Sequence, residues 1–298
     1  MRHRLMFKGL YTAIITPFHN GEVDYDTFTK LIEEQISAGV AGIVPAGTTG
    51  ESPTLAPDEH LKVIQHSVEV AAGRIQIVAG TGANSTQEAI HLTQEAEKLG
   101  IDGSLQVCPY YNKPSQEGLF QHYQAIANAT KIPLMLYSVP GRSSIEIGVE
   151  TTARLAEACK NIVSIKEAGG CVGRVNALKS SLPDEFTIVS GDDPLTLPFM
   201  ACGATGLVSV ASNLIPSEMN QLVQSMLDND LTTARGIHFD YLELMETLMG
   251  IATNPVGIKS AMALAGKCQN EFRLPLCPIE EEKAETIKSL LAKYDLLG

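Results

Sequence analysis

The sequence has few basic residues and no long apolar run. Its 298 residues include 22 lysines and arginines against 34 aspartates and glutamates, which gives a formal net charge of −12 at pH 7. A nucleic-acid-binding surface needs basic side chains that meet phosphates, so this balance excludes nucleic acid as an expected partner. No stretch approaches the roughly 18 consecutive apolar residues of a transmembrane helix, so no membrane partner is expected either.

Cysteine pairs and metal-binding motifs are also absent. The six cysteines include no C-x-x-C pair, and the seven histidines include no H-E-x-x-H pattern. The N-terminal residues 1–7 are basic but lack the apolar core of a signal peptide, and Met6 is a candidate start after an extension over residues 1–5. We therefore expect a cytoplasmic protein with reduced thiols and neither a metal nor another cofactor.

Short apolar runs alternate with amphipathic patterns along most of the chain. Several runs are continuously apolar, as is typical of parallel strands that are covered on both faces. The predicted strands cover residues 9–16, 41–44, 75–79, 103–107, 133–137, 162–166, 187–190 and 206–209. The helices predicted between them cover residues 24–38, 57–72, 86–99, 116–129, 149–159 and 172–181.

This alternation predicts the α/β class and a (β/α)8 TIM barrel over residues 1–225. A doubly wound open sheet is the main alternative, because alternation alone does not show that a sheet closes. After about Pro216 the strand pattern disappears, and only helical segments remain. We expect these to form a three-helix C-terminal appendage over residues 226–298.

Polar and glycine-rich segments follow the predicted strands at their carboxyl ends. They occupy residues 47–51, 109–112, 137–142, 166 and 191–193. The carboxyl ends of barrel strands meet at one face, where active sites of this fold lie. Side chains scattered over a surface would show no such bias, so one site is expected at this face.

Lys166 is the most informative of these residues, because it ends the apolar run 162–165. A lone lysine at a strand end more often points to solvent, since lysines are almost never fully buried. In a desolvated barrel mouth, however, a lysine keeps more of its amine neutral and can attack a ketone to form an imine.

The other residues have ordinary interpretations as well. Taken alone, Tyr137 and Tyr111 are more often core tyrosines, and Thr48 and Thr49 could form an ordinary turn. An arginine such as Arg142 is more often a solvated surface charge. If Arg142 instead points inward, its planar guanidinium suits a substrate carboxylate. Paired hydroxyls flanked by glycines likewise suit a small anion.

Several ordered motifs resemble the dihydrodipicolinate synthase / N-acetylneuraminate lyase family. They are T-A-I-I-T-P-F at 12–18, G-T-T-G-E-S-P-T-L at 47–55, C-P-Y-Y-N-K-P-S-Q-E-G at 108–118, Y-S-V-P-G-R at 137–142, I-K-E-A at 165–168, S-G-D-D at 190–193 and N-P-V at 254–256. Together they span most of the chain, and they override the ordinary interpretation of each residue taken alone.

The resemblance implies a catalytic role for Lys166, which would form a Schiff base with pyruvate. Tyr137 would act as general acid and base near the imine, linked by hydrogen bonds to Thr48 and Tyr111 in a proton relay. In this family the tyrosine that matches Tyr111 crosses a tight dimer into the neighbouring site. The expected assembly is therefore a homotetramer built as a dimer of dimers.

The resemblance also implies how the substrates bind. Thr49, with the backbone amides of Thr48 and Thr49, would hold the pyruvate carboxylate, and backbone carbonyls at Gly191 and Val208 would line the pocket. Arg142 would bind the carboxylate of L-aspartate 4-semialdehyde, which favours the synthase branch and lysine/diaminopimelate biosynthesis. Two residues depart from the family pattern, which has asparagine and threonine at the positions of Ser138 and Ser143.

A regulatory site is implied too. Family members that lysine inhibits bind it at the tight-dimer interface, through residues that match His60, Asn84, Glu88 and Tyr110. Glu88 would neutralise the lysine ammonium. A further family histidine is replaced by Pro57, which is expected to weaken the sensitivity.

Two alternatives stay open. One is another pyruvate aldolase of this family, acting on a sugar acid or 2-keto acid. The other is a non-catalytic binding protein that kept the barrel, although a binding protein has no need of a trapped amine at Lys166.

Overall fold

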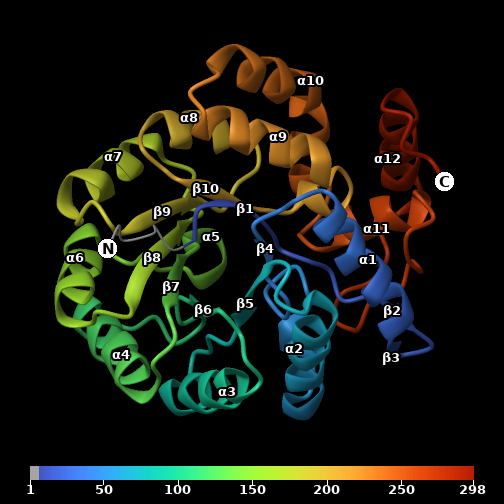
Figure 1. The fold of residues 1–298 in the computed structure, drawn as a ribbon. Helices are drawn as coiled ribbons and strands as arrows, with labels where there is room; N and C mark the ends of the chain where they lie inside the picture. The colour runs from blue at the N-terminus through green and yellow to red at the C-terminus, as the bar shows by residue number, and fades with distance from the viewer. Residues whose placement is uncertain (1–6) are drawn as a thin grey trace.

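A computed structural model describes residues 7–298 (Figure 1). The extension over residues 1–5 and the candidate start Met6 lie outside the described residues. Within the described part of the chain, no helix is long and apolar enough to cross a membrane.

Eight parallel strands form a closed barrel in the order β1-β10-β9-β8-β7-β6-β5-β4. Pairing of β1 with both β10 and β4 closes the ring, which confirms the TIM barrel and rules out an open doubly wound sheet. The strands are β1 (Gly9–Thr12), β4 (Gly42–Ile43), β5 (Gln76–Gly80), β6 (Gly103–Val107), β7 (Leu134–Ser138), β8 (Ile162–Glu167), β9 (Thr187–Ser190) and β10 (Gly206–Ser209).

The first strand is shorter than the predicted run 9–16. The Ala13 amide still donates to the Ser209 carbonyl of β10 at 2.8 Å, but the strand ends there, and the Ile15 amide donates instead to the Asn213 side chain at 3.1 Å. Ile14 and Ile15 are nevertheless buried, which explains the apolar pattern. A small antiparallel hairpin follows, formed by β2 (Phe18–His19) and β3 (Glu22–Val23), and it was not predicted.

A ring of helices surrounds the barrel (Figure 1). They are α1 (Tyr25–Ser37), α2 (Pro57–Ala71), α3 (Thr86–Lys98), α4 (Gln116–Ala129), α6 (Val149–Ala158), α7 (Val172–Ser181), α8 (Thr196–Ala201) and α9 (Pro216–Leu227). Asp24 caps α1 by accepting a hydrogen bond from the Thr27 amide at 2.9 Å, as its side-chain type favours. Gly39 follows this helix with a φ of +71°, a conformation that glycine adopts without strain.

Short helical turns and a C-terminal group of helices complete the fold. The turns are η1 (Ser52–Thr54), α5 (Pro140–Ser143) and η2 (Ala211–Asn213). The C-terminal helices are α10 (Leu231–Gly250), α11 (Val256–Leu264) and α12 (Glu281–Lys293), drawn in orange to red in Figure 1. Helix α10 packs against α9, and α11 packs against both α10 and α12. The division of the chain at residue 225 stays a prediction.

Two apolar cores position the site. The larger core lies between the strands and the surrounding helices, and the smaller one fills the inside of the barrel. Phe7, Tyr11 and Met135 belong to the inner core and are essentially inaccessible to solvent. The inside of the barrel is therefore a packed core, and the cavity described below lies where its strands end.

Candidate active site

A cavity of about 110 Å³ lies at the carboxyl ends of the barrel strands. Residues on or directly after seven of the eight barrel strands line it, together with Met249 and Asn254 from the C-terminal segment. The predicted site residues among them are Thr48, Thr49, Tyr137, Arg142, Lys166 and Gly191. The structure thus brings six predicted residues to one place, although they are far apart in the sequence.

Lys166 lies on β8 with only 6% of its surface exposed. It pairs in register with Tyr137 on β7, and its Nζ lies 4.1 Å from the centroid of the tyrosine ring. Gly191 leaves room for the lysine stem, because a Cβ at that position would lie 2.8 Å from the Lys166 Cε. The amine therefore stands at the floor of the cavity, with an aromatic face beside it.

Several hydrogen bonds hold the Thr48–Thr49 turn in place. The Thr49 hydroxyl is buried and accepts a hydrogen bond from Asn254 Nδ2 at 3.0 Å. The Glu51 amide donates to the Thr48 carbonyl at 3.1 Å, and Thr16 Oγ donates to the Gly50 carbonyl at 2.7 Å. Because Asn254 occupies an acceptor site of Thr49, the threonine O–H stays free to donate to another group.

Arg142 lies on α5 beside the cavity, and its side chain is exposed. Its Nη2 donates to the Asn254 main-chain carbonyl at 2.8 Å. That contact uses one of the five guanidinium N–H groups and leaves the others available. Arg142 is thus placed to meet an anion at the mouth of the cavity.

Two predicted residues lie away from this cavity. Tyr111, in the loop between β6 and α4, is 91% exposed, has a φ of +73° and does not line the cavity of its own chain. Val208 belongs to the inner core of the barrel, whereas Val210, two residues further on, lines the cavity. The relay of Thr48, Tyr137 and Tyr111 is therefore not assembled within one chain.

Three acidic or amide residues near the cavity had no predicted role, although they stand in the S-G-D-D and N-P-V motifs. Asp192 and Asn254 line the cavity. Asp193 is buried behind it and accepts hydrogen bonds from the Ser209 hydroxyl at 2.5 Å and from the Val210 amide at 2.9 Å. Burial raises the pKa of the Asp193 carboxyl, and these hydrogen bonds and the charge of Lys166 act in the opposite direction.

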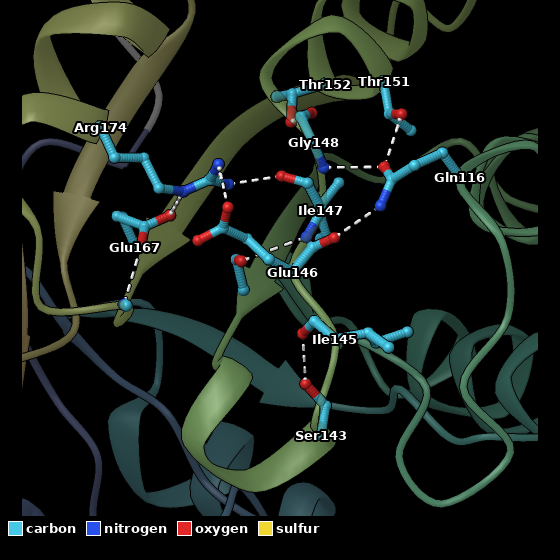
Figure 2. A network of polar contacts seen from close by, with 12 residues as sticks. Gln116, Ser143, Ile145, Glu146, Ile147, Gly148, Thr151, Thr152, Glu167 and Arg174 are labelled. Carbon is cyan, nitrogen blue, oxygen red and sulfur yellow. Dashed lines mark hydrogen bonds and ion pairs between the residues drawn. The ribbon is translucent and has the colours of Figure 1, made fainter.

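A buried ion pair follows Lys166 directly. Glu167 has no exposed surface, and its carboxylate accepts hydrogen bonds from Arg174 Nε and from the Gly169 amide, each at 2.7 Å. Burial raises the pKa of Glu167, and the charge of Arg174 opposes that shift. Figure 2 shows the Arg174 guanidinium directed toward Glu167, Glu146 and the main chain of Ile147.

The same network fixes the segment 145–148 that follows α5. Gln116 donates to the Glu146 carbonyl at 2.8 Å, and its oxygen accepts from the Gly148 amide at 2.8 Å (Figure 2). Ser143 Oγ donates to the Ile145 carbonyl at 2.7 Å. The helix that carries Arg142 is therefore anchored on its far side to α4, β8 and α7.

The predicted regulatory residues lie close together on another part of the surface. His60 is buried on α2 and hydrogen-bonds the Gly80 carbonyl at 2.7 Å, while Asn84 Nδ2 donates to the Tyr110 carbonyl at 3.1 Å. Burial lowers the pKa of His60, and the nearby Glu88 charge acts against this shift. Burial and Glu88 both raise the pKa of Tyr110.

A family model described as the dihydrodipicolinate synthetase family matches residues 6–294. The chain belongs to this family. The resemblance that the ordered motifs indicated is thereby confirmed, and the protein is a lyase of this family.

Individual relatives cover nearly the whole chain. The chain is 48% identical over 292 residues to the 4-hydroxy-tetrahydrodipicolinate synthase of Endomicrobium trichonymphae, which covers 98% of this chain and 100% of that protein. The solved dihydrodipicolinate synthase from Aquifex aeolicus superposes with a TM-score of 0.96 at 45% identity, covering 98% of this chain and 99% of its own. The synthase from Cyanidioschyzon merolae, solved with lysine bound, gives a TM-score of 0.95 at 39% identity. The match covers 99% of this chain and 100% of that chain.

Proposed function

We propose that this protein is a cytoplasmic 4-hydroxy-tetrahydrodipicolinate synthase, which condenses pyruvate with L-aspartate 4-semialdehyde in lysine and diaminopimelate biosynthesis. The observation that carries the proposal is the buried amine of Lys166 at the floor of a cavity that also contains Tyr137, Thr49 and Arg142. Relatives at 46–49% identity over nearly their full length bear this name.

Pyruvate binds with its carboxylate against the Thr48–Thr49 turn. The Thr49 O–H is free to donate because Asn254 already occupies one of its acceptor sites. Backbone amides of the turn supply further donors to the anion. This placement brings the ketone carbon of pyruvate toward the Lys166 amine.

The reaction then proceeds through an imine. The Lys166 amine attacks the ketone, water leaves, and the protonated imine withdraws electrons from the neighbouring methyl group. Tyr137, 4.1 Å from the Lys166 nitrogen at its ring centroid, gives its phenolic proton to the hydroxyl that leaves as water, and the resulting phenolate takes a methyl proton to give the enamine. The imine takes the place of a metal as electron sink, so the scheme needs no cofactor.

Carbon–carbon bond formation follows at the acceptor. The enamine carbon attacks the aldehyde of L-aspartate 4-semialdehyde, whose carboxylate Arg142 holds at the mouth of the cavity. The amine of the substrate then displaces the Lys166 nitrogen, which closes the six-membered ring and frees the enzyme.

The proton relay requires assembly. We propose that Tyr111 reaches the cavity of a neighbouring subunit in a homotetramer, since the side chain is 91% exposed and lies away from its own cavity. Its φ of +73° is unusual for a bulky residue and costs free energy unless contacts compensate for it. Packing against a second subunit would supply such contacts.

We further propose that lysine regulates this activity at the cluster of His60, Asn84, Glu88 and Tyr110. The cluster adjoins the loop of Tyr111, and Glu88 supplies a negative charge for an ammonium group. A relative of 39% identity was solved with lysine bound.

The decisive experiment compares acceptors. Condensation of pyruvate is measured with L-aspartate 4-semialdehyde and, under the same conditions, with N-acetylmannosamine and simple sugar aldehydes. We expect strong preference for the semialdehyde and loss of that preference in Arg142→Ala, with the half-saturating pyruvate concentration unchanged. Preference for a sugar aldehyde would refute the synthase assignment and favour an aldolase of the same family.

A further inference from the structure

A second buried ion pair adjoins the turn that holds the substrate carboxylate. Lys259 Nζ, on α11, lies 2.6 Å from Glu51 Oε1, and neither side chain has any exposed surface. Glu51 stands two residues after Thr49 and has a left-handed φ of +55°. The pair therefore joins the turn at 47–51 to a helix more than 200 residues later in the chain.

The C-terminal segment encloses this pair. The Lys259 nitrogen lies 4.1 Å from the centroid of the Phe18 ring and 5.1 Å from that of Phe272, so aromatic faces rather than water surround the ammonium. The second carboxylate oxygen of Glu51 accepts from the Arg273 amide at 3.3 Å. Both oxygens of Glu51 are thus held by residues that follow the barrel.

The same segment contacts the turn at a second point. Asn254, two residues before α11, donates to Thr49 Oγ at 3.0 Å, and its main-chain carbonyl accepts from Arg142 at 2.8 Å. Asn254 and Lys259 thus hold the turn at residues 49 and 51 from one side. This arrangement fixes the direction of the Thr49 hydroxyl as well as the path of its main chain.

Stability alone does not account for a pair of this kind. Well-packed apolar side chains in place of a buried ion pair are often as stable or more stable, because desolvation offsets the attraction. A hydrogen-bonded pair differs from apolar packing in that it prescribes direction and distance. Here the ion pair fixes the position and direction of the Glu51 side chain, two residues after Thr49.

We propose that Lys259, together with Asn254, is a positioning residue for the 2-keto-acid carboxylate. It acts through Glu51, by holding the Thr48–Thr49 turn in the geometry in which its donors meet that carboxylate. The inference rests on the proposed function, because it concerns how pyruvate binds before the imine forms. It assigns to the C-terminal segment a part in binding at the barrel mouth.

The test uses three variants and one control. Lys259→Met removes the ammonium, and the double variant Lys259→Met/Glu51→Gln leaves no uncompensated charge. Asn254→Ala removes only the second contact. Lys267→Met is the matched control, because Lys267 lies on the same segment but pairs with the half-exposed Glu34, away from the turn.

The measured quantity is the fraction of protein that carries the pyruvate adduct on Lys166. The adduct is trapped with borohydride and quantified by mass spectrometry across a range of pyruvate concentrations. We expect the half-saturating concentration to rise about tenfold or more in the double variant and in Asn254→Ala, as the loss of one directional hydrogen bond predicts. The adduct yield at saturating pyruvate should stay within about threefold of the wild type, because the Lys166 amine is unchanged, and Lys267→Met should match the wild type throughout.

Each outcome decides between specific conclusions. A double variant with wild-type thermal stability and a wild-type half-saturating pyruvate concentration would show that the pair is only structural. If Lys259 variants do not fold, Asn254→Ala decides instead, and an unchanged half-saturation there overturns the proposal. Absence of an adduct in the wild type would refute the proposed function itself, which keeps the two failures distinguishable.

Discussion

Replacing Arg174 with methionine gives the sharpest test of how the site is supported. The guanidinium is 92% buried, since only 8% of the side chain is exposed, and it is the counter-charge of the fully buried Glu167. Methionine keeps most of the volume but leaves the carboxylate next to Lys166 without its partner. The ion pair of Arg174 with Glu146, a residue 45% exposed, adds little, because water screens such contacts.

The expected loss follows from the burial of the pair. Removing one partner of a buried ion pair costs about 3–5 kcal/mol, since the other charge stays desolvated. With an unfolding entropy of about 2.1 cal/mol/K per residue, a chain of 298 residues has about 0.6 kcal/mol/K. The thermal midpoint of Arg174→Met should therefore fall by about 5–8 °C at neutral pH.

The loss should also depend on pH. Burial raises the pKa of Glu167 and Arg174 opposes that shift, so the variant raises the pKa further. A carboxyl whose pKa is higher in the folded state than in the unfolded state holds its proton better when folded. Stability therefore falls as pH rises from the ordinary pKa through the raised one. The loss of stability of Arg174→Met relative to the wild type should therefore be large at pH 8 and smaller at pH 5.

Differential scanning calorimetry at the two pH values checks this prediction, with Arg174→Met/Glu167→Gln as the control. The double variant has no titrating carboxyl at this position, so the extra loss of stability that Arg174→Met shows between pH 5 and pH 8 should be absent from it. A midpoint within 1–2 °C of the wild type for Arg174→Met, or a deficit independent of pH, would refute the reasoning from burial.

Two further predictions concern the chemistry and its control. Tyr137→Phe should lower kcat by about 10²- to 10⁴-fold, as expected for the loss of a general acid and base, while borohydride still links pyruvate to Lys166; an unchanged kcat in steady-state assays would exclude Tyr137 from proton transfer. Lysine should inhibit the wild type at saturating pyruvate, and Glu88→Gln should abolish the inhibition with kcat unchanged, since the amide is neutral. A flat lysine titration of the wild type would reject the regulatory site.

Much of the barrel was predictable because parallel strands covered on both faces are continuously apolar. The predicted strands 103–107, 187–190 and 206–209 have the bounds of β6, β9 and β10. Residues 13–16 show the limit of this pattern. They are as apolar and as buried as a strand, but Ile15 bonds to a side chain of η2 instead of to the ladder. Apolar periodicity reports burial and does not report the partner of a backbone amide.

The site was predictable only where the strands themselves place it. Lys166 and Tyr137 end neighbouring strands, so the register of a parallel pair brings them together. Arg142 lies on the short helix α5, which follows β7 directly and places it beside the cavity. Tyr111 is exposed and does not line its own cavity, and only the assembly proposed above gives it a role.

The contacts that hold the turn at 47–51 could not be predicted from the sequence, for a physical reason. Lys259 lies on helix α11 and Asn254 in the turn before it, both after the barrel, and their spacing from Glu51 and Thr49 exceeds 200 residues. No periodicity or motif relates positions so far apart, and a lone lysine in a helix is normally solvated. Burial of Lys259 becomes intelligible only when the fold brings Glu51 to it, because neither charge could remain desolvated alone. The barrel strands therefore determine where the chemistry lies, while the C-terminal helices determine how rigidly the turn beside it is held.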